Sequence, residues 1–208
     1  MEQVEQTEQH RELMAEAIER DGEGQRALLA GDGQTARVAF STASELYRRS
    51  WKVAPSGAYG RLVGMLKSAI LAGGGEEQAD YARSALGKVR ERSPTASYAR
   101  AIAALLVGDD EAARQAAVGM RAGSGAFGRT ADAVVALADR DDRAYTVSLA
   151  AIVRDFEARE RHLTGVPIAD TGLVLERLAQ RRGMRGGLAS PLLPTALIAA
   201  EPPRPAST

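Results

Sequence analysis

The fold is decided by residues 31–55, which read GDGQTARVAFSTASELYRRSWKVAP. The Gly-Asp-Gly turn at the start and the proline at the end limit one helix, from about Gln34 to Ala54. Within it, apolar residues recur at spacings of four, three, four and four: Ala36, Phe40, Ala43, Tyr47 and Trp51. That spacing places all five on one face of a helix. The stretch therefore predicts an amphipathic helix whose apolar face needs a partner.

The same alternation of helix and breaker runs along the rest of the chain. We expect further helices at about residues 8–30, 58–72, 76–91, 94–107, 110–121, 127–138, 142–163 and 167–182. Pro94 and Pro167 are read as first helical residues, a position that favours proline. Gly22 and Gly24 either split the first helix or weaken it. Period-2 alternation is nearly absent, so the pattern predicts an all-α fold of about nine helices.

A second pattern repeats near the start of alternate helices. A turn residue is followed five positions later by Ala. The residue four positions after this Ala, and the residue three positions after that, lie on the same helix face and are expected to point toward the partner helix. The four sets are Gly31, Ala36, Phe40, Ala43; Gly74, Ala79, Arg83, Leu86; Gly108, Ala113, Ala117, Met120; and Asp139, Ala144, Ser148, Ala151. A small residue at this place lets two antiparallel helices cross closely, and each hairpin then leaves an apolar side for the next to cover.

Over about residues 20–155 this spacing resembles the tetratricopeptide repeat. The resemblance implies antiparallel helical hairpins stacked as an α-solenoid with a concave groove for a partner. The first-helix signature of that family, with Trp, Leu-Gly and Tyr, is missing from every unit. An irregular helical bundle is therefore the alternative architecture.

The chain is expected to form one α-helical repeat-like domain over residues 1–200. Residues 201–208 read EPPRPAST, and three prolines with few apolar groups predict a disordered tail. The first residues are polar, and no run of about 18 apolar residues occurs, as a membrane span would need. These features predict a bacterial cytoplasmic protein.

Composition argues against several classes of function. Lys and Arg number 27 and Asp and Glu number 27, so a broad electrostatic footprint for nucleic acid or an anionic membrane is not expected. The chain has no cysteine and only two histidines, His10 and His162, so we expect neither a metal nor a cofactor. His162 shares a helical face with Asp155 and Arg159, which predicts an intrahelical ion-pair ladder. No cluster carries a catalytic signature.

The segment Phe156 to Pro194 has a distinctive order of features. A charged helix end is followed by Pro167-Ile168-Ala169-Asp170-Thr171 and by a closing Ser190-Pro191-Leu192-Leu193-Pro194. The segment resembles the C-terminal end of helical immunity proteins from bacterial polymorphic toxin systems. That resemblance implies a protein that neutralises a toxin, and it carries over no binding residues.

The leading interpretation is a non-catalytic binding protein that engages a protein or peptide. Aromatic and Arg side chains anchor many interfaces, and four cluster around one expected helix-helix corner: Tyr47, Arg49, Tyr59 and Arg61. These four are the predicted partner-binding residues. The rival is an enzyme that uses isolated carboxylates: Asp155, Glu157 or Asp170. The pattern leaves open whether the chain forms a homo-oligomer.

Overall fold

The computed structural model describes the chain over residues 2–87 and 93–194. Over these residues the chain forms nine α-helices and no strand, which confirms the all-α prediction. The helices are α1 (Glu2–Leu29), α2 (Gly33–Val53), α3 (Gly60–Leu71), α4 (Glu76–Gly87), α5 (Pro94–Val107), α6 (Asp110–Met120), α7 (Gly125–Asp139), α8 (Asp142–Glu157) and α9 (Asp170–Gln180).

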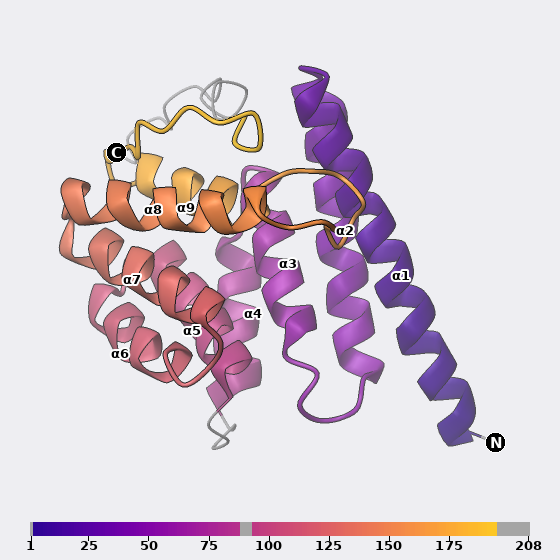
Figure 1. Ribbon diagram of the computed structural model, residues 1–208. Helices are drawn as coiled ribbons and strands as arrows, with labels where there is room; N and C mark the ends of the chain where they lie inside the picture. Colours follow the sequence, from indigo (N-terminus) through magenta and orange to yellow (C-terminus); the bar gives the residue numbers. More distant parts are fainter. Residues whose placement is uncertain (1, 88–92, 195–208) are drawn as a thin grey trace, which may run out of the picture.

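Helices that follow one another in the chain pack against one another, as stacked hairpins do. The most extensive contacts are those of α1 with α2, α2 with α3, α5 with α6, and α7 with α8, while α3 also packs on α5. Figure 1 shows α1, α2 and α3 side by side at one end and α5, α6 and α7 at the other, with α8 running across the top. The ninth helix leaves this sequence and packs against α3, α7 and α8.

Three helices, α2, α6 and α8, begin in the same way. A residue with positive φ reverses the chain, and the aspartate after it accepts a hydrogen bond from the backbone N–H three residues on. The pairs are Gly31-Asp32, Gly108-Asp109 and Arg140-Asp141. Aspartate is a favoured helix cap because its carboxylate satisfies an otherwise unpaired N–H and lies at the positive end of the helix dipole.

The close-crossing alanines of the repeat are buried in three of its four units. Ala36, Ala79 and Ala113 are at most 1% exposed. In the fourth unit the register is off by one residue, because Tyr145 donates its backbone N–H to the Asp141 carbonyl as Ala36 does to Asp32. Tyr145 is fully buried at that position and Ala144 is only half-buried. A large residue therefore fills the groove where a small one was expected.

The first helix runs unbroken through both of its glycines. Gly24 lies where a Cβ atom would come within 2.8 Å of the Phe40 ring, so this glycine permits the close approach of α1 and α2. The two-helix alternative is therefore wrong. Proline at the start of α5 is confirmed: Ser93 caps the helix and Pro94 opens it.

Two predicted boundaries in the C-terminal third are wrong. The eighth helix was expected to reach residue 163 but ends at Glu157, and α9 begins at Asp170 instead of Pro167. The backbone N–H of Ala169 donates to the carbonyl of Leu192 (2.7 Å), which holds the residues before α9 out of the helix. Residues 158–169 thus form a strap that crosses from α8 toward α1 and α2 and returns to α9 (Figure 1).

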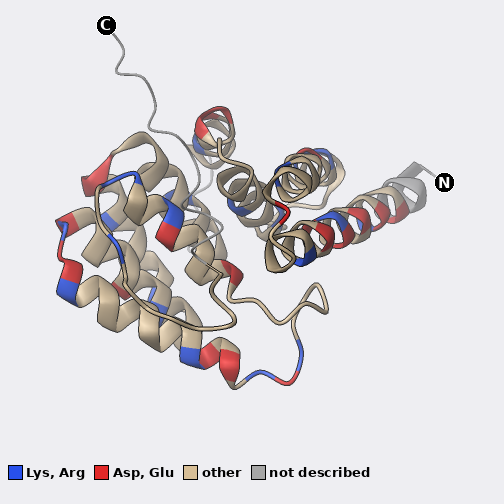
Figure 2. Cartoon of the chain, turned by 90° about the horizontal axis from the view of Figure 1, so that it is seen from above, with Lys and Arg blue, Asp and Glu red and all other residues tan. Residues whose placement is uncertain are grey.

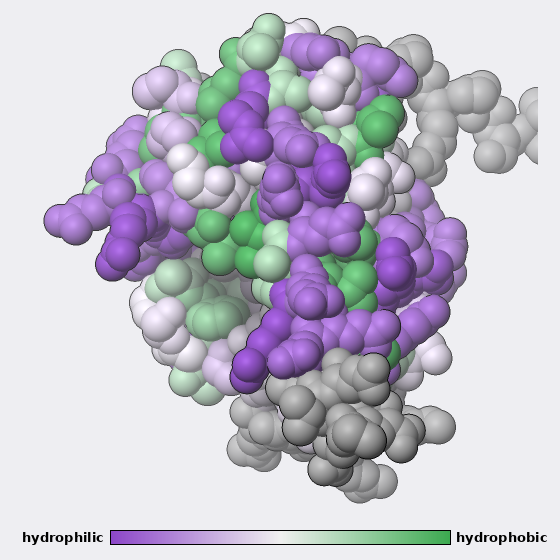
Figure 3. Space-filling model, turned by 90° about the vertical axis from the view of Figure 1, so that its right-hand side faces the viewer, coloured by the Kyte–Doolittle hydropathy of each residue, from purple (hydrophilic) through white to green (hydrophobic). Residues whose placement is uncertain are grey.

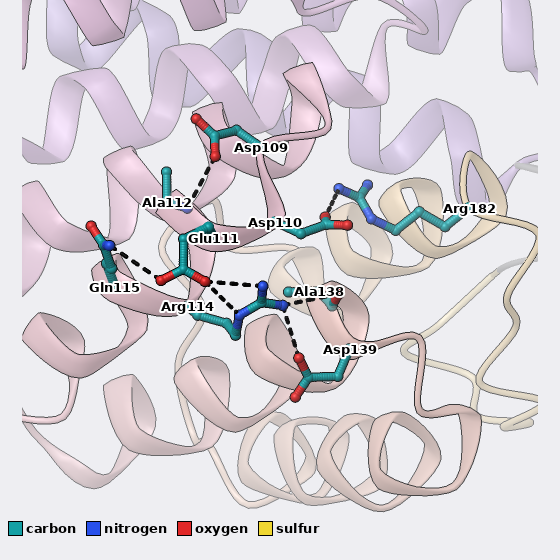
Figure 4. Close-up of polar contacts among 9 residues, drawn as sticks. All are labelled: Asp109, Asp110, Glu111, Ala112, Arg114, Gln115, Ala138, Asp139 and Arg182. Atoms are coloured by element: carbon teal, nitrogen blue, oxygen red, sulfur yellow. Dashed lines mark hydrogen bonds and ion pairs between the residues drawn. The ribbon is translucent and has the colours of Figure 1, made fainter.

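The helix α9 lies in the interior of the molecule. Every residue from Gly172 to Ala179 is buried, including the carboxylate of Glu176, which accepts hydrogen bonds from the Tyr145 hydroxyl (2.7 Å) and the Gly186 N–H (2.9 Å). Just beyond α9, Arg182 donates to the Leu105 carbonyl (2.7 Å) and to Asp110. Figure 4 shows this arginine reaching the α5–α6 corner, beside the Arg114 network that joins α6 to the end of α7.

Acidic and basic residues are interspersed along α1 and occur on the other helices in view (Figure 2). The side of the molecule that carries α1 shows hydrophobic patches between hydrophilic groups (Figure 3). No described helix is long and apolar enough to cross a membrane. The expected tail at 201–208 and the end of the helix expected at 76–91 lie outside the described residues.

A candidate binding site between α1, α3 and α9

A cavity of about 270 Å³ lies where α1, α2 and α3 meet the strap and the start of α9. Apolar side chains form much of its wall, including those of Met14, Phe40, Leu71 and Val166. The polar groups that line it come from every one of these elements: Asp21, Gln25, Tyr47, Lys67, Ser68, Arg159, His162, Thr164, Asp170 and Thr171. We call it the polar cavity.

Asp21 is the central acidic group of the polar cavity. Its carboxylate accepts hydrogen bonds from the Tyr47 hydroxyl (2.9 Å) and the Ser68 hydroxyl (2.6 Å). Burial disfavours the charged form and raises the pKa of Asp21 to about 6, although both hydroxyls and the charge of Lys67 act in the opposite direction. Among the described residues, no Lys, Arg or His forms an ion pair with this carboxylate.

Lys67 on α3 directly precedes Ser68, which bonds to Asp21, but Lys67 itself pairs with a different carboxylate. Its ammonium group forms an ion pair with Asp170 at the first residue of α9 and donates to the Thr171 hydroxyl (3.2 Å). Desolvation favours the neutral amine and is the largest single effect, but the charge and hydrogen bond of Asp170, together with Tyr98 and Asp21, outweigh it, so the pKa of Lys67 lies above its ordinary value. This ion pair fixes α9 against α3.

The strap closes one side of the polar cavity. Thr164 donates a hydrogen bond to the side-chain oxygen of Gln25 on α1, which holds the far end of the strap in place. The imidazole of His162 stacks on the Phe156 ring with centroids 6.2 Å apart. Its Nδ1 atom is buried and has no hydrogen-bond partner within the described part of the chain.

Only part of the ion-pair ladder predicted for Asp155, Arg159 and His162 is present. Asp155 pairs with Arg159 (2.6 Å) and with Arg129 of α7. Because α8 ends at Glu157, His162 belongs to the strap and does not join the ladder. Arg159 instead lies 3.7 Å from the centre of the Phe156 ring, between its carboxylate partner and the cavity.

A second hollow of about 250 Å³ adjoins the polar cavity. We call it the apolar hollow, since side chains such as Tyr98, Phe127 and Ile152 form its wall. The two hollows share five lining residues: Gly60, Val63, Phe156, Arg159 and Thr171. The two hollows therefore lie side by side and are bordered by the same five residues.

The four predicted partner-binding residues do not share an exposed surface. Tyr47 is 2% exposed and serves the polar cavity through Asp21, while Tyr59 is 6% exposed and packs on Trp51. Arg61 is half-buried and bonds to Ser50 and to His10 of α1. Arg49 alone is exposed. Their short sequence spacing was correct for one corner of the fold, but helix packing turned the aromatic rings inward.

The three carboxylates predicted for an enzyme also lie apart. Asp155 is held by two arginines, Asp170 by Lys67, and Glu157 accepts a hydrogen bond from Ser190 (2.9 Å). Only Asp170 lines the polar cavity.

Sequence reasoning missed Asp21, although the sequence contained a signal for it. Asp21 falls on the apolar stripe of α1 that carries Leu13, Ala17 and Leu28, which are all buried. A lone acid on such a stripe indicates a polar group directed into the interior. Lys67 and Ser68 break the apolar face of α3 in the same way.

No three described His, Asp or Glu side chains gather in a way that could hold a metal ion. Comparison with known proteins adds no further assignment: no protein family, curated protein or solved structure matches this chain.

Proposed function

We propose that this chain is a non-catalytic binding protein that holds a segment of a protein or peptide partner in the polar cavity and the apolar hollow. The observation that carries the proposal is the junction of these two hollows along Val63, Phe156 and Arg159. In an extended segment, side chains two residues apart point to the same face and are about 7 Å apart, so one such side chain can enter each hollow.

The contacts of the three carboxylates predicted for an enzyme support binding over catalysis. A general base needs a carboxylate that can accept a proton from the substrate. Asp155 and Asp170 are engaged by cationic partners, and Glu157 by a hydroxyl. These contacts join α8 to α7, α9 to α3, and the end of α8 to the C-terminal segment. A toxin would be one kind of protein partner in this scheme.

The concave surface predicted from the repeat is not where we place the partner. The ninth helix packs against α3, α7 and α8, so the chain itself covers the faces of these helices. The partner is placed beside α9, where the strap and α1 leave space.

The proposal is tested by blocking the junction. Val63→Trp adds a large ring at a residue that lines both hollows, whereas Val118→Trp adds the same ring at a site on α6 that is 68% exposed. Proteins retained by each variant from a lysate of the source organism are quantified by mass spectrometry, after circular dichroism has confirmed the fold. We expect a stoichiometric partner with the unmodified chain and with Val118→Trp, and its loss with Val63→Trp. Equal retention by both variants would exclude this site.

A further inference from the structure

The polar cavity is lined by two acidic side chains, Asp21 and Asp170, and by two basic ones, Lys67 and Arg159. Each basic side chain has a different aspartate as its partner, since Lys67 pairs with Asp170 and Arg159 with Asp155. Asp21 has no ion pair among the described residues: two neutral hydroxyls donate to it, and Lys67 acts on its charge at longer range. Burying a carboxylate without a counter-ion is unfavourable, so the site is suited to a cation from outside the chain.

The remaining wall of the polar cavity is also suited to a cation. The rings of Phe40 and Tyr47 line it, and aromatic faces attract ammonium groups. The buried Nδ1 of His162 lacks a hydrogen-bond partner among the described residues and accepts a hydrogen bond in one of its tautomers. Arg159 lines the same cavity and pairs with Asp155, a carboxylate that it shares with Arg129.

We propose that the polar cavity binds a primary ammonium group, with Asp21 as its counter-ion and His162 Nδ1 as a second acceptor. The ammonium belongs either to a lysine side chain of the partner or to a free amine. This inference rests on the proposed function, because the apolar hollow then receives the apolar group next to the ammonium. The bound cation gives Asp21 the ion-pair partner that the described part of the chain does not supply.

Two matched pairs of probes test the inference. The first pair is acetyl-Phe-Gly-Lys-amide and acetyl-Phe-Gly-norleucine-amide, which differ only in the ammonium group of the side chain. The second pair is phenethylamine and 2-phenylethanol, in which a neutral hydroxyl replaces the ammonium group and no peptide is present. Dissociation constants are measured by NMR titration of the full chain at pH 7.5. We expect each ammonium probe, or the lysine peptide alone, to bind at least tenfold more tightly than its neutral partner, a difference of about 1.4 kcal/mol.

Variants of two aspartates test whether the preference for the ammonium probes arises in the polar cavity. Asp21→Asn keeps the side-chain shape and removes the charge, so it should reduce the preference to less than about twofold. Asp132→Asn makes the same change at a carboxylate of α7 that is 58% exposed and paired with Arg121, and it should leave the preference intact.

The possible outcomes separate the two proposals. A preference in the peptide pair alone assigns the ammonium to a partner's lysine, and a preference in both pairs includes free amines. Equal affinity within both pairs, no binding by any probe at 10 mM, or a preference that survives Asp21→Asn would overturn the ammonium inference. The proposed function is judged separately by partner retention in Val63→Trp, and it would survive each of these results.

Discussion

Asp21 is a residue that makes the folded state less stable at neutral pH. Burial raises its pKa from 3.8 to about 6, which means that the folded environment disfavours the charged carboxylate relative to water. The hydrogen bonds from the hydroxyls of Tyr47 and Ser68 offset part, but not all, of the free-energy cost of burying the charged carboxylate. Strongly perturbed groups in cavities are frequent at functional sites, and the position of Asp21 in the polar cavity agrees with such a role.

Stability should therefore depend on pH through this carboxylate. The pKa of Asp21 is higher in the folded state than in the unfolded state. Its stabilising contribution to the free energy of unfolding is therefore fully present below about pH 3.8 and is lost as pH rises through about 6. The charged neighbours in this range are Lys67 and Asp170, with Tyr47 and Ser68 neutral. We expect Asp21→Asn to gain stability relative to the unmodified chain between pH 4 and pH 7, by up to about 3 kcal/mol.

The gain is measured by urea unfolding of both chains at several pH values, so that the titration of all other carboxylates cancels in the difference. Asp132→Asn serves as the control and should show a difference that does not change with pH. A flat difference for Asp21→Asn would mean that Asp21 titrates normally in the folded state.

At the scale of the elements, two glycines set how closely the first three helices pack. Gly24 of α1 lies under the Phe40 ring, and Gly64 of α3 lies under the Tyr47 ring; in both, a Cβ atom would come within 2.8 Å of ring carbons. Glycine inside a helix is unfavourable by roughly 0.5–1 kcal/mol relative to alanine. Close contact of the helices with aromatic rings of α2 explains why glycine stands at these two positions.

Replacing glycine with alanine should therefore lower the stability of the fold at some glycines and raise it at others. Gly24→Ala and Gly64→Ala force a ring to move and should destabilise the fold by about 1–3 kcal/mol. Gly128→Ala, in a helix with no atom within 4 Å of the added methyl group, should stabilise it by roughly 0.5–1 kcal/mol. Thermal melting of the three variants compares them directly. A gain at Gly24 similar to that at Gly128 would show that α1 and α2 are further apart than described.

At the scale of the whole molecule, α9 holds the two ends of the fold together. Its first residue is bound to Lys67 of α3, its middle to Tyr145 of α8, and the arginine beyond its end to the α5–α6 corner. Because it is buried along most of its length, its removal would expose apolar faces of α3, α7 and α8 to water. The polar cavity would also lose one of its walls.

Truncation should reveal this role. A chain that ends at residue 168 lacks α9 and should lose cooperative thermal unfolding, because the exposed apolar surface is no longer covered. A chain that ends at residue 200 keeps α9 and should melt within error of the full chain, as the composition of the last eight residues predicts. Cooperative melting of the shorter chain at the original temperature would show that the hairpins are stable without α9.

The sequence by itself determined the helices and most of their boundaries. Hydrophobic periodicity, turn glycines and the Ser93-Pro94 start are local signals, since each helical hydrogen bond joins residues only four positions apart. The same signals put Ala36 and Ala113 in the hairpin crossings, where the structure shows them buried.

Only the tertiary structure decided where α8 ends, where α9 begins, and which polar groups meet. Lys67 and Asp170 are 103 residues apart, and the bond from Thr164 to Gln25 spans 139 residues. No local spacing encodes such contacts, because they depend on how whole helices pack. That packing gathered Asp21, Lys67 and Asp170 around one cavity. The candidate site follows from the long-range arrangement of helices that the sequence had already specified one by one.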